Sequence, residues 1–435
     1  MERELFTKLE RWMKKKNRKP LIIQGARQVG KTWIMKEFGA RFYENTVYIN
    51  FDNNKAMKDV FELDFDLKRI LSAIKIEYGK SFQAENTLII FDEIQEAPKA
   101  LASLKYFYEN APQYAIVAAG SLLGVALHQG TSFPVGKVDF LDLYPLNFRE
   151  FLCAMGEKQF VSMLDSCDTQ MVTVFKTKYI ERLREYYFVG GMPEVVKDFS
   201  EKKDYNRVRA IQKNLINYYQ QDFSKHAEIK LVPRLNLVWN SIPMQLAKEN
   251  KKYIYGQVRE GSRAKDFELA IQWLLDCGLI HKVQRIQKPD LPLKAYIDFD
   301  AFKLFLVDIG LLIAMTDLDA KVIIEGNKIF TEFKGSLTEQ YILQQLISDV
   351  GVIPYYYSTQ NSKGEIDFLV QGKTSVIPIE VKAEENLKAK SLKAFCEKYQ
   401  PSYAVRTSMS DYREQDWMTN IPLYAIKWIE NYVNQ

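Results

Sequence analysis

A loop suited to binding phosphate stands near the start of the sequence. Eight consecutive residues match the spacing G-x-x-x-x-G-K-[ST]: Gly25, Ala26, Arg27, Gln28, Val29, Gly30, Lys31 and Thr32. The apolar run Leu21–Ile23 precedes them and a helical pattern follows, which is the context that the motif requires. Glycines let successive backbone N–H groups curl around phosphate oxygens, and the helix N-terminus adds partial positive charge. Lys31 can then reach the outer phosphates and Thr32 can bind Mg²⁺.

Two adjacent acids form the second chemical feature. The segment Leu88–Glu93 (LIIFDE) is an apolar run closed by Asp92 and Glu93, about sixty residues beyond Lys31. In a phosphoryl-transfer site Asp92 would hold Mg²⁺ through water, and Glu93 would orient or deprotonate the attacking water. Taken alone, the acids are a solvated strand end and the glycine loop is a turn before a helix. Together, at this spacing, they favour a nucleotide site with Mg²⁺.

These motifs need a framework that places them side by side. Five short apolar runs supply it: Leu21–Ile23, Thr46–Phe51, Thr87–Phe91, Tyr114–Ala119 and Val138–Leu143. Helical segments lie between the runs, and buried strands that alternate with helices predict a parallel sheet covered on both faces. The sequence therefore predicts an α/β fold with a P-loop sheet sandwich in a first domain over residues 1–150.

The pattern changes after about residue 145, and three further domains are predicted. Residues 151–225 are wholly helical and form a lid-like region, and residues 226–300 form a winged helix. In the latter, three helices precede a short strand and a hairpin tip at Gln287–Asp290. Residues 301–435 show a helix, three strands and a helix, which predicts a small α/β domain.

The predicted winged helix carries a few basic residues near its recognition helix. They are Arg259, Arg263 and Lys265. Clustered cations at that position indicate duplex DNA binding, but winged helices also serve as plain protein contacts. Both interpretations stay open.

A second cluster of charged residues lies in the last domain. Glu380 and Lys382 are two positions apart on one predicted strand, so their side chains share a face, and Asp367 lies on the preceding strand. Glu339 lies on the helix before them. Asp367, Glu380 and Glu339 would bind Mg²⁺, and Lys382 would position or activate a hydrolytic water. This constellation resembles that of PD-(D/E)xK nucleases. The alternatives are a solvated strand face, or a nuclease-like fold that only binds.

Several segments resemble one family of bacterial and archaeal AAA-type ATPases, in which an ATPase module is joined to a C-terminal domain of unknown function (DUF4143). They are GARQVGKT, LIIFDEIQ, AAGSLLG, DLYPLNFREF, YFVGGMPEVV, IPMQLAKENKKYIY, DCGLIHKV and FKLFLVDIGLL. The resemblance covers nearly the whole chain. It implies ATP binding, slow hydrolysis, a winged-helix region and a C-terminal domain similar to the restriction-endonuclease fold.

The resemblance also suggests roles for residues outside the two motifs. Ser121 ends the fourth apolar run, where a polar side chain points at the γ-phosphate and senses hydrolysis in the related ATPases; the alternative is a helix cap. An arginine finger completes many such sites. Arg27 and Arg149 are the candidates, and a plain surface arginine is the favoured interpretation of each.

Composition excludes several classes of protein. Of the 435 residues 47% are hydrophobic and 26% charged, and 60 Lys and Arg against 55 Asp and Glu give a net charge of +5. A chain of this composition is not expected to be disordered. Its net charge is also too small to require a nucleic-acid partner. The four cysteines form no C-x-x-C pair, and the histidines lie far apart, so no zinc site is expected. The longest apolar run, Phe302–Met315, is interrupted by Lys303 and Asp308 and is too short to span a membrane.

The sequence thus predicts a cytoplasmic protein that binds and hydrolyses ATP with Mg²⁺. In the first hypothesis it acts on double-stranded DNA through the winged helix and a metal-dependent nuclease-like domain. In the alternative it is an ATP-regulated protein-interaction switch whose nuclease-like domain is inactive. A second copy of the chain is a further candidate partner.

Overall fold

The computed structural model describes residues 2–79, 81–124, 133–248, 251–324, 331–359, 364–385 and 389–435. The chain divides into two compact units. The N-terminal unit comprises residues 3–144 and 276–278, and the C-terminal unit comprises residues 145–275 and 279–435 with the first two residues.

A five-stranded parallel sheet forms the centre of the N-terminal unit, in the order β2-β3-β4-β1-β5. Its strands are β1 (Leu21–Gln24), β2 (Asn45–Asn50), β3 (Thr87–Asp92), β4 (Ala115–Ala119) and β5 (Asp139–Asp142). β1 and β3 are separated only by β4, so the loops that follow them meet at one edge of the sheet. The predicted strands and their parallel arrangement are confirmed.

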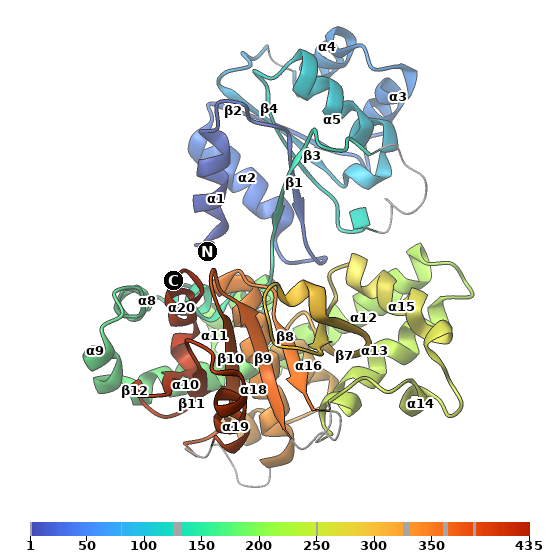
Figure 1. Ribbon diagram of the computed structural model, residues 1–435. Coiled ribbons are helices and arrows are strands. Elements are labelled where there is room, and N and C mark those ends of the chain that lie inside the picture. Colours follow the sequence, from blue (N-terminus) through green and yellow to red (C-terminus); the bar gives the residue numbers. More distant parts are fainter. Residues whose placement is uncertain are drawn as a thin grey trace. The chain divides into compact units, whose positions relative to one another are not determined.

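Helices cover this sheet on both faces (Figure 1). They are α1 (Leu5–Met13), α2 (Lys31–Phe42), α3 (Lys55–Leu63), α4 (Leu67–Tyr78) and α5 (Pro98–Asn110), with a 3₁₀ turn η1 (Ile94–Glu96). Apolar residues of α3, α4 and α5 form one core with β2, β3 and β4, which includes Phe51, Phe61 and Phe91. α2 packs against β2, β3 and β4, and α1 packs on α2. Burial on both faces explains why the strands are continuous apolar runs.

The C-terminal unit contains a mixed eight-stranded sheet in the order β12-β13-β11-β10-β9-β8-β6-β7. The strands are β6 (Ile280–Ile286), β7 (Ile297–Leu306), β8 (Tyr355–Ser358), β9 (Glu365–Gln371), β10 (Val376–Val381), β11 (Val405–Ser408), β12 (Arg413–Gln415) and β13 (Met418–Pro422). The predicted strands of the last domain correspond to β8, β9 and β10. The sheet is nevertheless larger than expected.

Helices make up most of the remaining C-terminal unit (Figure 1). Those before the sheet are α7 (Phe148–Ala154), α8 (Lys158–Asp165), α9 (Thr169–Val174), α10 (Lys176–Val189), α11 (Pro193–Lys202), α12 (Tyr205–His226), α13 (Val232–Leu246), α14 (Tyr255–Val258) and α15 (Ala264–Asp276). Those within and after it are η2 (Leu293–Tyr296), α16 (Ile309–Met315), α17 (Ala320–Ile324), α18 (Thr331–Gln345), the π-helical turn η4 (Leu346–Val350), α19 (Lys390–Tyr399), η5 (Leu423–Ile429) and α20 (Glu430–Val433). α18 and α19 both pack against β10.

The hairpin β6–β7 differs from its predicted role as the wing of a winged helix. β6 pairs antiparallel with β7 and parallel with β8, so the hairpin extends the C-terminal sheet. The reason lies in β7, whose last six residues, Ala301–Leu306, are all buried and need a neighbouring strand and covering helices. The predicted domain boundary at residue 300 therefore falls inside β7, and the division of the C-terminal unit into three domains stays a prediction.

The apolar run Phe302–Met315 forms the end of β7 and the short helix α16. Within the described residues, we find no helix with the length and apolar character that crossing a membrane requires.

Candidate nucleotide site

The phosphate loop lies between β1 and α2, as the motif predicts. Gly25 and Gly30 have φ angles of 144° and 96°, which favour glycine. At Gly25 a Cβ atom would also lie 2.1 Å from the carbonyl oxygen of Leu143, so no larger residue fits there. Gly30 is the N-cap of α2, and the free N–H groups of the first turn of that helix point into the loop region.

Lys31, the first residue of α2, is buried within the loop. Its Nζ donates to the carbonyl oxygens of Gly25 at 2.8 Å and Ala26 at 2.7 Å. Burial lowers the pKa of Lys31 to about 8, although the nearby carboxylates of Glu93 and Asp92 oppose the change. Because carbonyl oxygens neutralise no charge, the ammonium group keeps its capacity to bind an anion.

Thr32 and Asp92 are brought together although they lie sixty residues apart in the chain. Thr32 Oγ1 donates to Asp92 Oδ2 at 2.7 Å, and the hydroxyl of Tyr48 donates to the same oxygen at 2.8 Å. Asp92 is only 3% exposed and has neutral donors around it. A hydroxyl and a carboxylate at the end of a strand are oxygen ligands that Mg²⁺ prefers, so the residues fit the predicted ion.

Glu93 begins a chain of polar contacts that returns to the phosphate loop. Its Oε2 accepts hydrogen bonds from Gln95 Nε2 at 2.7 Å and from Ser121 Oγ at 3.2 Å. Arg27 Nε in turn donates to Ser121 Oγ at 3.1 Å. The predicted residues Glu93, Ser121 and Arg27 thus form one network, with both bonds to Glu93 made at a single carboxylate oxygen.

Three further residues of this site were not found from the sequence. They are Tyr48 and Asn50 on β2 and Gln95 in η1. Asn50 lies opposite Asp92 in the parallel register, and its Nδ2 donates to the Tyr48 hydroxyl at 3.4 Å. Burial and the bond to Asp92 raise the pKa of Tyr48, so it stays a donor. The sequence signal for Tyr48 and Asn50 was that they are polar residues two positions apart at the carboxyl end of a strand.

Three family models match the chain. Residues 17–152 match the model described as an AAA domain. Residues 334–426 match a domain of unknown function (DUF4143), and residues 180–322 match another domain of unknown function (DUF8612). The chain therefore contains an AAA domain, which carries the P-loop, and a DUF4143 domain.

Solved structures resemble this chain at low sequence identity. The Walker-type ATPase PABY2304 of Pyrococcus abyssi is 14% identical, and the match covers 72% of this chain and 95% of that chain with a TM-score of 0.45. Cdc6p from Pyrobaculum aerophilum is 10% identical over 74% of this chain and 92% of its own, with a TM-score of 0.25. A chain of Drosophila ORC bound to AT-rich DNA and Cdc6 is 12% identical over 72% and 90%, with a TM-score of 0.22. No curated protein matches the chain.

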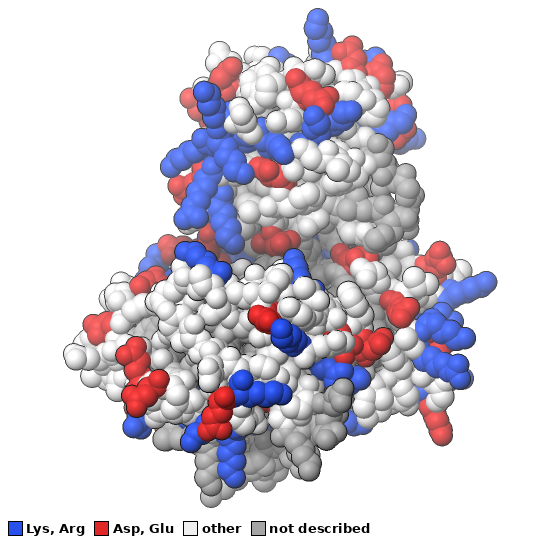
Figure 2. Space-filling view, in the orientation of Figure 1, with Lys and Arg blue, Asp and Glu red and all other residues white. Residues whose placement is uncertain are grey.

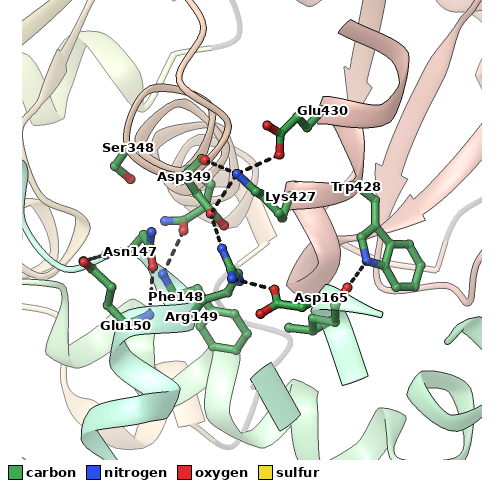
Figure 3. Close-up of polar contacts among 12 residues, drawn as sticks. Asn147, Phe148, Arg149, Glu150, Asp165, Ser348, Asp349, Lys427, Trp428 and Glu430 are labelled. Carbon is green, nitrogen blue, oxygen red and sulfur yellow. Dashed lines mark hydrogen bonds and ion pairs between the residues drawn. The ribbon is translucent and has the colours of Figure 1, made fainter. Parts of the chain in front are cut away.

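Arg149 forms ion pairs with two aspartates, and most of its side chain is buried (Figure 3). Its side chain is 13% exposed, and it contacts Asp349 at 2.9 Å and Asp165 at 2.5 Å. The neighbouring N–H of Phe148 donates to Gln345 Oε1 at 2.8 Å. The surface-arginine interpretation of Arg149 is therefore wrong. The segment instead ties α7 to the end of α18 within the C-terminal unit.

The structure does not bring the predicted metal ligands of the last domain into one group. Within the described residues, no group of three or more His, Cys, Asp or Glu side chains could hold a metal ion, and Glu339, Asp367 and Glu380 are all described. Asp367 Oδ2 accepts from the backbone N–H of Val381 at 2.7 Å. Burial, and then Glu339, raise the pKa of Asp367 to about 7.

Glu380 has a different set of neighbours. It forms an ion pair with Lys382 at 2.8 Å and lies opposite Arg406 of β11. Burial, and to a smaller extent Glu380, raise the pKa of Cys396 to about 11. The pairing of β9 with β8 explains the separation from Asp367. Tyr355 and Tyr357 are two residues apart, but their partners on β9 are three apart, so a bulge next to Asp367 interrupts the alternation of side chains that the prediction assumed.

Proposed function

We propose that the AAA domain binds ATP with Mg²⁺ and hydrolyses it, and that the bound nucleotide controls the protein contacts of the C-terminal unit. The observation that carries the first part is the hydrogen bond between Thr32 and Asp92, with the network of Glu93, Ser121 and Arg27 beside it.

The residues of the site divide the work. The N–H groups of the loop and the Lys31 ammonium bind the phosphates, and Lys31 exchanges two carbonyl oxygens for phosphate oxygens as it does so. Thr32 and Asp92 would hold Mg²⁺, which neutralises developing charge on the phosphates when it is bound. Glu93 orients the attacking water and accepts its proton. Ser121, bonded to both Glu93 and Arg27, links the state of the γ-phosphate to the catalytic acid.

The second part of the proposal favours the interaction switch over the nuclease. Its support is that Asp367 and Glu380 have different neighbours and that Glu339 and Glu365 are paired with lysines. DNA binding by α13–α15 stays a prediction. Figure 2 shows Lys and Arg interspersed with Asp and Glu around α14 and α15, which does not favour either DNA or a protein as the partner. A homo-oligomer also stays a prediction.

The test begins with nucleotide binding. Lys31→Ala should weaken binding of a labelled ATP analogue by roughly a hundredfold, because charged hydrogen bonds to phosphate are lost. The exposed Lys105 gives a matched control, since Lys105→Ala should bind as the unchanged protein does. Undiminished binding by Lys31→Ala would contradict the assignment of the loop.

The switch is tested by comparing nucleotide states. ATP bound to Glu93→Gln should alter hydrogen–deuterium exchange in residues 145–435 relative to ADP, and Lys31→Ala should show no such difference. Identical exchange of the C-terminal unit with ATP and ADP would contradict the switch while leaving the ATPase assignment intact.

A further inference from the structure

We propose that Lys303, with Lys251, supplies to the acids Glu339, Glu365 and Asp367 the positive charge that a divalent cation would supply in a metal site. The acidic cluster of the DUF4143-containing unit is then complete without metal. This inference concerns a site apart from the ATPase and does not depend on nucleotide.

Lys303 lies at the centre of the cluster. It projects from β7 with a side chain only 1% exposed. Its Nζ lies 2.5 Å from Glu365 Oε1 on β9 and 3.6 Å from Glu339 Oε2 on α18. The ring of Tyr356 is 4.9 Å from the same nitrogen and adds a cation–π contact. One ammonium group therefore joins acids from two different elements.

Lys251 completes the neutralisation from another side. Its Nζ forms an ion pair with Glu339 Oε1, whereas Lys303 lies 3.6 Å from Glu339 Oε2. Both lysines thus form ion pairs with Glu339, and Oε2 accepts no hydrogen bond. Although burial opposes it, the two lysines hold the pKa of Glu339 below its ordinary value.

The cost of burying charged groups explains why Lys303 lies among these acids. Buried charges are tolerated only when they are paired, because desolvation costs several kcal/mol per ion. Burial acts to lower the pKa of Lys303, but Glu339, Glu365 and Asp367 together hold it above the ordinary value. A divalent ion among the same acids would lie beside two ammonium groups and be repelled by both. The cluster is thus closed to metal while Lys303 is charged.

The E-x-K lysine does not take part. Lys382 is 32% exposed and bonds to Glu380 at 2.8 Å, and Glu380 belongs to the neighbourhood of Arg406 and Cys396. Lys382 directly follows β10 of the same sheet and therefore serves as a matched control.

The first test is a Mn²⁺ titration of the nucleotide-free full chain, followed by electron paramagnetic resonance of free Mn²⁺. The unchanged protein and Asp367→Asn should show the same binding, with no saturable site lost in the variant. A saturable Mn²⁺ site that disappears in Asp367→Asn would overturn the proposal. This arm does not require any unstable variant.

The second test removes the internal cation. Lys303→Met should lower the melting temperature by on the order of 10 °C, because Glu365 loses its ion pair and Glu339 keeps only that with Lys251, whereas Lys382→Met should lower it by a few degrees at most. Millimolar Mn²⁺ should restore part of the loss in Lys303→Met and none in Lys382→Met. Equal melting temperatures of the two variants, or no response of Lys303→Met to Mn²⁺, would overturn the proposal.

Discussion

The nucleotide site of the N-terminal unit and the acidic cluster of the C-terminal unit contain the same kinds of residue and use them in opposite ways. In the first, Lys31 bonds to backbone carbonyls and Asp92 accepts from the hydroxyls of Thr32 and Tyr48. In the second, Lys303 pairs directly with Glu339 and Glu365. A charged side chain with neutral partners can still bind a charged ligand. A side chain that is already paired with an opposite charge cannot.

The pKa shifts of the two lysines have opposite directions for this reason. Burial lowers the pKa of Lys31 to about 8, because its partners do not balance its charge. Burial also acts on Lys303, but three carboxylates more than offset it and raise the pKa. A lysine whose charge is not balanced is poised to bind phosphate, and a lysine that is balanced stabilises the fold.

The largest effect is expected from the catalytic acid of the first site. Glu93→Gln should reduce the rate of ATP hydrolysis by about 10²–10⁴-fold, because the water loses its base, while ATP binding is kept. Rates of phosphate release and binding of a labelled analogue measure the two quantities. The nearby Glu96→Gln should hydrolyse normally, and wild-type turnover by Glu93→Gln would show that another group is the base.

Removing Lys303 and removing Lys31 should change the stability of their two units by different amounts. Lys303→Met should destabilise the C-terminal unit by roughly 3–5 kcal/mol, because unpaired buried acids remain. Lys31→Met should leave the N-terminal unit as stable as before or slightly more stable, since its buried charge has no charged partner in direct contact. Urea unfolding followed by hydrogen exchange assigns each change to its unit. A comparable loss of stability in Lys31→Met would contradict the proposed difference between the two lysines.

Asp308 can be compared with Glu339, because it is a buried acid of the same unit whose hydrogen-bond donors are neutral. It accepts from the N–H groups of Gly191 at 2.6 Å and Leu311 at 3.0 Å, and from Gln344 Nε2 at 3.4 Å. Burial raises its pKa from 3.8 to about 6, against these hydrogen bonds. Glu339 differs, since lysines lower its pKa.

The raised pKa of Asp308 predicts a pH dependence of stability. The folded protein binds this proton more tightly than the unfolded chain, so the contribution is present below pH 3.8 and is lost as the pH rises through about 6. The loss should amount to about 3 kcal/mol. It is measured as the difference between the unchanged protein and Asp308→Asn in urea unfolding at pH 4 and pH 7. A difference that does not change with pH would contradict the assigned direction.

The nucleotide site was largely predictable because its motifs are local. The loop Gly25–Thr32 and the acids Asp92 and Glu93 each lie within a few residues, and parallel strands place their carboxyl ends together. The partners Tyr48 and Gln95 were missed because hydrogen bonds from neighbouring elements leave no spacing in the sequence.

The acidic cluster was only partly predictable, for the opposite reason. The helix and the strand that carry its acids were expected, and Glu339 and Asp367 do lie near one another. Lys303 was noticed only as an interruption of an apolar run, and its partners lie on β9 and α18, far along the chain. A charged residue inside such a run was the signal that a buried partner had to exist.

The binding of Mn²⁺ with and without a non-hydrolysable ATP analogue distinguishes the two sites in one experiment. We expect one Mn²⁺ ion that binds only with the analogue, is lost in Lys31→Ala and is unaffected in Asp367→Asn. Mn²⁺ bound without nucleotide and released by Asp367→Asn would contradict this expectation, because the acids near Lys303 would then be free to hold a metal.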